Sequence, residues 1–386
     1  MSRGGQFKSM ICRQWDLHPP FEPRSIPVSA GERFDLILVF GPTDELSRPD
    51  FFSALQNRFP GTMIAGCSTC GEISLGGALD DHLVLTGIRF ERTRLRFATA
   101  PIGVGQDIDA GRQLAQKLMA PDLRLVLVLV EGLRVHAQGL VDGLLSGIPP
   151  EVPISGGLAA DGYRFQKTVV LTPDGLSGNQ ALAIGFYGES LQVRVASATG
   201  WEPFGRTRRV SRSKGSVVYE LDGKPALGVY AGYLGEEASH LPASGLVYPV
   251  AVQTETDGVG LIRSLSGVNR EDGSLTFFGD IPEGSSIRLM NASYRELIAG
   301  ASKAASHALE GLADPGRLSL GLLFSCAGRK AVMKSHTALE VAAVAQHLPD
   351  SVCLTGFHTY GEIGYSEATG KCEHHNQTMT VTFLTE

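Results

Sequence analysis

Short apolar runs rich in β-branched and aliphatic residues alternate with stretches of helical spacing along most of the chain, and this alternation repeats. Three segments share one order: an apolar run, a turn, a helical stretch, a second apolar run and a loop bracketed by glycines. Their opening apolar runs span residues 34–40, 123–130 and 318–324, and their helical stretches span 50–59, 136–147 and 336–348. A strand, a helix and a second strand in this order are typical of a βαβ unit, so the sequence predicts parallel strand pairs.

The loop that closes each segment has the form Gly-x4-Gly. The three loops are Gly66–Gly71, Gly157–Gly162 and Gly356–Gly361. The first and third loops also share their threonine and the Glu-Ile pair that follows, which places Glu72 and Glu362 at equivalent positions. Loops at the carboxyl ends of parallel strands border the crevice where open α/β sheets bind ligands, and glycines allow the backbone to approach a ligand closely. The alternative interpretation is a tight crossover turn without a ligand.

The remaining elements complete a mixed α/β fold. Helical spacing also occurs at 107–119 and 294–312, before the second and third segments, and antiparallel pairs are predicted for 83–90 with 95–100, 181–187 with 191–198, and 260–268 with 274–278. We therefore expect mixed sheets built from repeated strand–helix–strand units in two pseudo-symmetric halves. The charged stretch 206–227 interrupts the apolar pattern, and its basic cluster (Arg206, Arg208, Arg209, Arg212 and Lys214) is expected in a solvated loop. The predicted division is an N-terminal extension 1–30, an N-terminal domain 31–222 and a C-terminal domain 223–386.

Composition narrows the class of protein. Hydrophobic residues make up 43% and charged residues 19% of the 386 residues, which is typical of globular domains. The net charge of −6 gives no basic footprint for nucleic acid. The longest apolar run, Leu125–Val130, is far shorter than a membrane span, and no signal peptide is recognisable, so we expect a cytoplasmic protein without membrane insertion. The six cysteines are then expected as free thiols.

Several side chains in and beside the loops could contact a ligand. The guanidinium of Arg329 follows a predicted strand end, where it could bind a carboxylate through two hydrogen bonds or simply begin a helix at the surface. Glu72 and Glu362 could act as a pair of acids, or could hold their loops by accepting backbone hydrogen bonds. The candidate ligand-binding residues are Cys67, Ser68, Thr69, Glu72, Asp161, Cys326, Arg329, Tyr360 and Glu362.

Two further hypotheses concern cysteine and histidine. Cys67 and Cys70 form a Cys-x2-Cys pair, which could serve a thiol-based redox enzyme, although no helix follows to lower the thiol pKa. The same pair is half of a zinc site, which Cys372, His374 and His375 could complete if the two halves meet. His358 lies within the third loop and could ligate a haem iron, while a hydrogen-bonded imidazole is the simpler interpretation.

The chain resembles the FIST family of prokaryotic sensory proteins over most of its length. The N-terminal half is similar at Gly66–Ile73, Ile154–Asp161 and Val218–Ala226, and the C-terminal half at Gly279–Gly284, Phe324–Arg329, Gly356–Ile363 and His375–Thr378. This resemblance implies a non-enzymatic sensor of a small ligand, with amino acids proposed as ligands. A standalone subgroup binds haem to sense nitric oxide and acts in trans on a histidine kinase or a cyclic-di-GMP enzyme. The resemblance therefore implies either an amino acid or haem b with nitric oxide, and it makes His358 the first candidate for the iron ligand.

Overall fold

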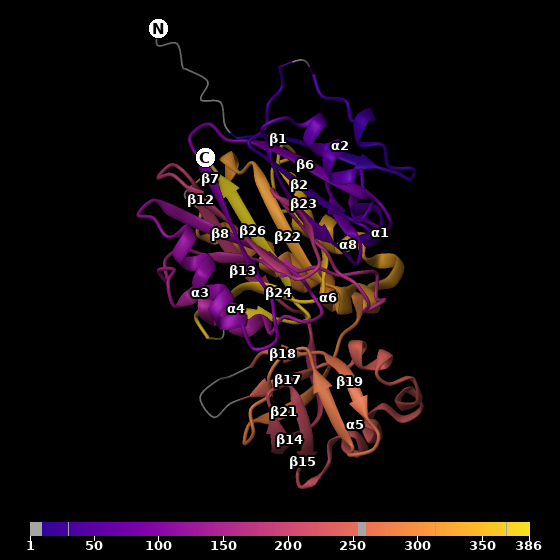
Figure 1. Ribbon diagram of the computed structural model, residues 1–386. Coiled ribbons are helices and arrows are strands. Elements are labelled where there is room, and N and C mark those ends of the chain that lie inside the picture. Colours follow the sequence, from indigo (N-terminus) through magenta and orange to yellow (C-terminus); the bar gives the residue numbers. More distant parts are fainter. Residues whose placement is uncertain (1–9, 30, 254–259, 313, 368) are drawn as a thin grey trace.

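A computed structural model describes residues 10–29, 31–253, 260–312, 314–367 and 369–386. The molecule has two parts, an α/β body and a smaller β-rich subdomain formed by residues 202–291 (Figure 1). The subdomain is an insertion, because the chain leaves the body after strand β13 (Gln192–Ala198) and returns at helix α6 (Tyr294–Glu310). None of the described helices is long and apolar enough to cross a membrane.

The body contains three six-stranded sheets of the same design. Each has a parallel pair at its centre: β2 with β3, β8 with β9, and β22 with β23. The first sheet runs β1 (Ile11–Leu17), β6 (Leu83–Arg89), β2 (Leu36–Gly41), β3 (Met63–Ser68), β10 (Val170–Thr172) and β11 (Gly175–Ser177). The second runs β25 (Lys371–His375), β24 (Glu362–Ser366), β9 (Ile154–Leu158), β8 (Leu123–Val130), β12 (Gln180–Tyr187) and β7 (Arg94–Pro101). The third runs β13, β26 (Met379–Thr385), β22 (Leu320–Cys326), β23 (Cys353–Thr359), β4 (Glu72–Ser74) and β5 (Gly77–Leu79).

The three units exchange their hairpins in a cycle. The hairpin β4–β5 of the first unit joins the third sheet, the hairpin β24–β25 of the third unit joins the second sheet, and β10–β11 of the second unit joins the first sheet. The register is the same each time, since the pairs Gly356↔Ile73, Gly156↔Ile363 and Gly66↔Leu171 correspond. The predicted βαβ repeats are therefore present, and their symmetry relates three interlocked units to one another.

A glycine on the second parallel strand is required in every unit. A Cβ atom on Gly66, Gly156 or Gly356 would lie 1.8 Å from the carbonyl oxygen of the residue paired with it on the first parallel strand. In the second unit the equivalent glycine is thus Gly156, one residue before the Gly157 that the loop pattern selected. The Gly-x4-Gly pattern fits only from Gly157 to Gly162, whereas the strand pairing makes Gly156 the equivalent glycine and places Asp161 where the other two loops have their second glycine.

The three sheets share one inner core and carry helices on their outer faces. Alternate residues of β2, β8 and β22 meet in the inner core, where Leu38, Leu127 and Leu322 are buried. The other faces pack against helices, so these strands are apolar on both sides, as expected for parallel strands in an α/β fold. The body helices are α1 (Thr43–Leu46), α2 (Phe51–Arg58), α3 (Asp107–Leu118), α4 (Ala137–Leu145), α6, α7 (Ala327–Met333) and α8 (Ala338–Ala345).

The β-rich subdomain is one continuous antiparallel sheet. Its spatial order is β18 (Ile262–Arg263), β17 (Val250–Gln253), β21 (Ser286–Asn291), β14 (Glu202–Lys214), β15 (Val217–Leu221), β20 (Ser274–Phe277) and β19 (Leu265–Asn269), with β16 (Lys224–Pro225) beside β15. Helix α5 (Ala226–Leu234) packs on it through Tyr230 and Leu234. The short 3-10 helices of the molecule are η1 (Pro23–Ser25), η2 (Gly235–His240), η3 (Ala243–Val247), η4 (Pro315–Arg317) and η5 (Lys334–His336).

The structure bears on several expectations from the sequence. The predicted pairs 83–90 with 95–100 and 181–187 with 191–198 were wrong, since β6 pairs with β1 and β2, β7 with β12, and β13 with β26. The basic cluster 206–214, expected in a solvated loop, lies in strand β14. The described part of the expected N-terminal extension contains β1, which pairs with β6 along seven positions and buries Trp15. The predicted division after residue 222 falls in the turn between β15 and β16, inside the subdomain, so the spatial division differs from the division along the sequence.

Candidate functional site

The three glycine-bracketed loops meet at the centre of the body. They are joined by a ring of backbone hydrogen bonds that repeats once per unit. In this ring Cys70 N donates to His358 O (2.9 Å), Ala160 N donates to Ser68 O (2.8 Å) and Tyr360 N donates to Leu158 O (3.4 Å). Because the loops satisfy one another, their first role is to lock the three units together.

The side chains of the first loop are buried and used within the protein. Ser68 Oγ accepts a hydrogen bond from Val169 N (3.0 Å), and Thr69 donates its hydroxyl hydrogen to Glu72. Glu72 also accepts from His82 N (3.1 Å). Burial raises the pKa of Glu72 to about 7 despite these bonds. Cys67 faces the inner core, so none of these groups is presented to solvent.

Asp161 and Tyr360 form a loop-holding pair. The carboxylate of Asp161 accepts hydrogen bonds from the backbone N–H groups of residues 165, 166 and 167 at 2.8–2.9 Å, and from the Tyr360 hydroxyl at 2.5 Å. Burial alone would raise the pKa of Asp161, but the Tyr360 hydroxyl and these N–H groups together lower it. The Tyr360 ring stacks on Phe165 with centroids 4.6 Å apart. This pair therefore fixes the path of loop 161–168 over the centre of the body.

Arg329 does not face a ligand, contrary to the expectation from sequence. Its guanidinium is fully buried and donates to Glu340 Oε2 (3.0 and 3.2 Å), Thr199 O (2.7 Å) and Leu297 O (2.8 Å). Glu340 in turn accepts from Ser325 Oγ (2.6 Å). Burial opposes ionisation of Glu340, but the Arg329 charge keeps the pKa of that carboxyl below its usual value. Arg329 thus ties helix α7 to α6 and α8 as part of the core.

His358 belongs to the same buried network. Its Nδ1 lies 3.3 Å from Gly71 O and its Nε2 lies 3.3 Å from Glu340 Oε1, and the side chain is fully buried. The structure therefore does not fit the iron-ligand role that the resemblance suggested for His358.

The three candidate-site cysteines, Cys67, Cys70 and Cys326, are buried rather than activated. Burial raises the pKa of Cys70 to about 12 and that of Cys67 and Cys326 well above the ordinary thiol value. Cys67 and Cys70 also point into different cores. Cys67 lies in the inner core, and Cys70 lies in the core around α3 and α4. No group of three metal-ligating side chains occurs among the described residues, so the zinc arrangement considered from sequence does not form there.

Glu362 occupies the position equivalent to Glu72, as predicted. The pairs Gly157↔Glu362 and Phe357↔Glu72 correspond in the second and third sheets. Glu362 Oε2 accepts from Thr378 N (3.0 Å) and Thr378 Oγ1 (2.8 Å), while Oε1 is buried without a partner among the described residues. Burial raises the pKa of Glu362 to about 8. The two acids lie in different sheets and hold their own hairpins, so they do not form a catalytic pair.

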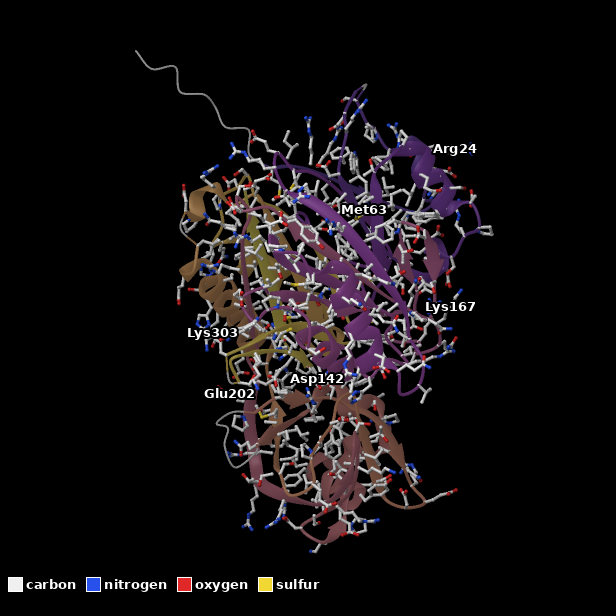
Figure 2. All side chains as sticks on the ribbon, turned by 60° about the vertical axis from the view of Figure 1, so that its left-hand side comes forward. Arg24, Met63, Asp142, Lys167, Glu202 and Lys303 are labelled. Atoms are coloured by element: carbon white, nitrogen blue, oxygen red, sulfur yellow. The ribbon has the colours of Figure 1, made fainter. Side chains whose placement is uncertain are left out.

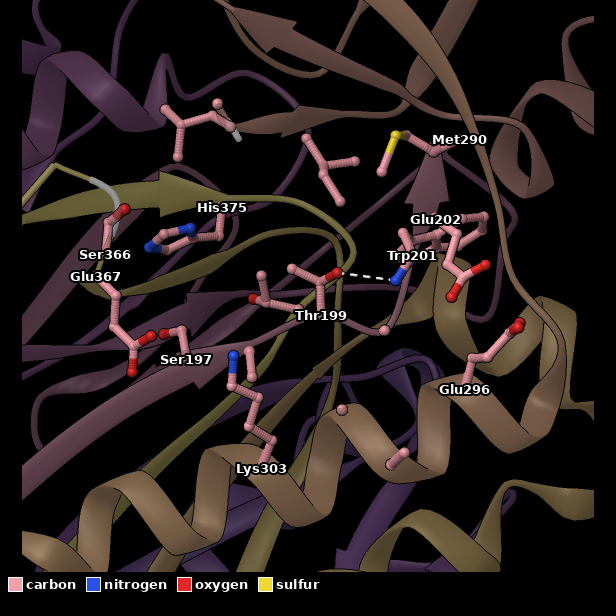
Figure 3. Close-up of a pocket in the computed structure, with 18 residues that line it drawn as sticks. Ser197, Thr199, Trp201, Glu202, Met290, Glu296, Lys303, Ser366, Glu367 and His375 are labelled. Atoms are coloured by element: carbon pink, nitrogen blue, oxygen red, sulfur yellow. Dashed lines mark hydrogen bonds between the residues drawn. The ribbon is translucent and has the colours of Figure 1, made fainter. Parts of the chain in front are cut away.

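The structure has a cavity where the subdomain meets the body. This junction crevice has a volume of about 530 Å³ and is bordered by the end of β13, the start of β14, one face of α6 and the β24–β25 hairpin (Figure 3). Figure 2 shows two of its charged residues, Glu202 and Lys303, near the place where the two parts join. Its lining includes Ser197, Thr199, Trp201, Glu202, Ile262, Met290, Glu296, Lys303, Ser366, Glu367, His375 and Thr378.

The charged groups of the junction crevice differ in whether they have partners. Glu296 completes the capping box of α6 by accepting from Ser293 N (2.6 Å), and Glu367 pairs with His307. The side chains of Lys303 and Glu202 make no hydrogen bond or ion pair within the part of the chain that the structure describes. One cation and one anion are thus available, on α6 and on β14, to groups of opposite charge.

Close backbone packing shapes the wall of the junction crevice. A Cβ atom on Gly300 would lie 1.7 Å from Thr199 O, and one on Gly200 would lie 2.3 Å from Glu296 O. Helix α6 therefore presses directly on the strand connection that leads into the subdomain. Trp201 follows, and its buried indole N–H has no partner among the described residues.

Sequence reasoning did not find the junction crevice. Its residues come from segments near 200, 262, 296 and 370, and no motif links them. Two features of the sequence could have indicated parts of its wall. They are the Gly200-Trp201 pair after a predicted strand and the capping sequence Ser293–Glu296 at the start of α6. Of the residues predicted from sequence, none of the loop residues lines this crevice.

The comparisons with known proteins agree with the sequence resemblance. The FIST N domain matches residues 35–224, and the FIST C domain matches residues 226–365. An uncharacterized protein of Methanocaldococcus jannaschii, MJ1623, is 31% identical over 162 residues, which are 38% of this chain and 31% of that protein. This chain thus spans about a third of that relative's length.

A cyanuric acid hydrolase from A. caulinodans aligns over 97% of this chain and 98% of its own, but at a TM-score of 0.35 and 8% identity, which are too low to indicate a shared fold. The two domain matches together cover most of the chain. The protein therefore belongs to the FIST family, whose N and C domains are signal-transduction sensor domains that bind small ligands.

Proposed function

We propose that this protein is a non-enzymatic sensor that binds its small ligand in the junction crevice and passes the signal to a partner protein in trans. The observation that carries this proposal is the position of the crevice. It is formed by both the body and the subdomain, so a ligand bound there contacts both parts and can favour one arrangement of them over another. Its volume of about 530 Å³ is in the range of small-molecule sites.

The ligand class follows from the two side chains without partners. Lys303 offers an ammonium group to a carboxylate, and Glu202 offers a carboxylate to an ammonium group, while Trp201, Ile262 and Met290 supply apolar surface. A free amino acid carries both charges and a side chain of variable size. We therefore assign Lys303 and Glu202 as the two charged contacts of an amino acid ligand.

Haem is the other ligand that the family resemblance suggested. His358 is buried and hydrogen-bonded on both nitrogens, and His375, which borders the crevice, holds its Nε2 3.1 Å from Gly364 O. Burial lowers the pKa of His375 to about 4 and keeps this imidazole neutral. Nε2 of each residue is held by a hydrogen bond within the protein, so these two histidines do not fit the role of haem-iron ligand, and the proposal omits nitric oxide sensing.

The thiol-enzyme alternative has no support in the site. A reactive cysteine needs a lowered pKa and access to its substrate, whereas burial raises the pKa of both Cys67 and Cys70. We therefore propose that the sensor acts on its partner through non-covalent contacts. A histidine kinase or a cyclic-di-GMP enzyme acting in trans is the partner class that we propose.

The test is isothermal titration calorimetry of the twenty common amino acids against the purified chain. We expect at least one to bind, and we expect Lys303→Met and Glu202→Gln each to weaken its binding about tenfold or more, because each variant removes one charge-assisted contact. Lys214→Met is the matched control, since Lys214 is exposed on β14 away from the crevice. Binding that is lost equally in the control, or that survives both crevice variants, would contradict the assignment.

A further inference from the structure

The subdomain carries a second, more open cavity on its outer side. This basic groove has a volume of about 730 Å³. One wall is the stretch of β14 around residue 206, the opposite wall is β16, and the floor is an exposed face of helix α5. It is lined by Gly205, Arg206, Arg208, Asp222, Lys224, Pro225, Gly228, Val229, Gly232 and Tyr233.

The charge of the basic groove is unbalanced. Arg208 is engaged, because it donates to Asp222 Oδ2 (2.9 Å) and to the Tyr233 hydroxyl (3.0 Å). Arg206 and Lys224 are exposed, and their side chains make no hydrogen bond or ion pair with any described residue. Since the one acid of the groove is already paired, two cations on opposite walls are left to an outside anion.

The floor of the groove is a helix face that nothing in the described part of the chain covers. Tyr230 and Leu234 bury the opposite face of α5 in the subdomain core. On the groove side, a Cβ atom on Gly228 or on Gly232 would meet no atom within 4 Å. The groove is therefore deep enough along α5 for another backbone to approach closely, with Val229 as an apolar contact on the floor.

We propose that the basic groove is a docking surface for an acidic helical segment of the partner protein. A helix laid along α5 would place small or apolar residues on its glycine positions and would direct acidic residues at Arg206 on one side and Lys224 on the other. The complementary charges identify the occupant as acidic, and the two-walled groove over a single helix favours one helical segment as its shape.

A long polyanion fits this surface less well. Helix α5 has nine residues, and the exposed acids Glu236 and Glu237 follow it immediately, so negative charge lies at the end of the groove. The whole chain also carries a net charge of −6. A nucleic acid backbone extending past the groove would meet this charge, whereas a short acidic helix would end before it.

Strand β14 connects the basic groove to the junction crevice. Glu202 at its start borders the crevice, and Arg206 and Arg208 border the groove. Between them the pairing with β21 shifts, because Phe204 pairs with Leu289 while Arg208 pairs with Ile287. The bulge at residues 205–207 thus contains Gly205 and Arg206 of the basic groove, and a displacement of Glu202 can be transmitted to it. This link rests on the proposed sensor function, whereas docking itself does not.

The experiment selects partners from a phage-displayed library of randomised helical peptides on the intact wild-type chain, with counter-selection on Arg206→Glu/Lys224→Glu. The best peptide is then measured by fluorescence anisotropy against wild type, the double variant and Gly232→Leu, which fills the groove where there is open space. Arg124→Glu serves as the matched control, because Arg124 is an exposed cation on β8 in the body. Thermal melting confirms that all variants are folded.

We expect the selected peptides to be acidic. Their affinity should fall about tenfold or more in the double variant and in Gly232→Leu, should be unchanged in Arg124→Glu, and should weaken from about 0.05 M to about 0.3 M salt. Selected peptides that are neutral or basic, or that bind Gly232→Leu as well as wild type, would overturn the proposal. So would a DNA oligonucleotide that outcompetes every peptide at the same residues. All of these measurements are made without an amino acid ligand, so their outcome is independent of whether the junction crevice binds one.

Discussion

Replacing Arg329 by methionine separates the structural role of this residue from the ligand-binding role that its sequence context suggests. In Arg329→Met, Glu340 becomes a buried carboxylate without its cation, and the carbonyl groups of Thr199 and Leu297 lose their donors. Removing one member of a buried ion pair costs about 3–5 kcal/mol. Each carbonyl left without its hydrogen-bond donor lowers the free energy of unfolding by about 1 kcal/mol or more. The loss is smaller for Thr199 because it borders the junction crevice.

We therefore expect the free energy of unfolding to fall by about 5 kcal/mol, a large fraction of what a typical protein has. The assay is urea unfolding followed by circular dichroism, with Arg329→Met/Glu340→Gln as the partner variant. The double variant should be more stable than the single one, because the neutral amide removes the uncompensated charge while still accepting from Ser325. A single variant within about 0.5 kcal/mol of wild type that fails to bind ligand would refute the structural role.

Four other predictions concern two kinds of buried group, the open face of α5 and the inserted subdomain. Because burial raises the folded pKa of Glu362 to about 8 from an ordinary 4.5, its stabilising contribution is complete below pH 4.5 and is lost progressively as the pH rises to about 8, so Glu362→Gln should flatten the fall in urea midpoint between about pH 5 and 8; an unchanged profile would contradict this. Cys67 and Cys70 should react with iodoacetamide at about pH 8 at least 100-fold more slowly in the folded chain than in urea, and equal rates would restore the thiol-enzyme hypothesis. Gly232→Ala should raise the free energy of unfolding by about 0.5–1 kcal/mol because the site is helical and open, and a loss would mean that the face is packed. Replacing residues 199–293 with the short connection 102–106, which joins β7 to α3 in the second unit, should leave a cooperatively folding body that no longer binds the ligand; failure to fold would show that the subdomain is part of the core.

Much of the body could be predicted from the sequence because its signals are local. The run Leu123–Val130 is observed as β8 with the same ends, and the predicted pair 260–268 with 274–278 is observed as β19 with β20. The equivalence of Glu72 and Glu362 also came from a local likeness and is confirmed by strand register. The predicted pairs 83–90 with 95–100 and 181–187 with 191–198 were wrong, because the second strand of each pairs with a strand from a distant part of the chain, β7 with β12 and β13 with β26.

The hairpin exchange could not be predicted in this way. The pairs that carry it join residues far apart, such as Gly66 with Leu171 and Phe357 with Glu72, and a hairpin has the same composition whichever sheet it enters. Arg329 was misjudged for a related reason. A cation that follows a strand end is expected to be exposed to solvent. Burial of Arg329 is favourable only because a later helix, α8, supplies Glu340 as its partner. The residues that decide the outcome lie outside the motif.

The same geometry explains why the repeated loops, which look like a site in the sequence, are mainly structural, and why a site is found elsewhere. Where the three units repeat, the hydrogen-bonding groups of each loop are paired with those of the neighbouring loops, as in the bond from Ala160 N to Ser68 O. Few donors and acceptors are therefore left for a ligand. Between β13 and α6 the third unit carries the subdomain, where the second unit has only a five-residue connection between β7 and α3. The wall of the junction crevice is built at this insertion. Groups there, such as Lys303 and Glu202, have no counterpart in a neighbouring unit to satisfy them, which is why they remain available to a ligand.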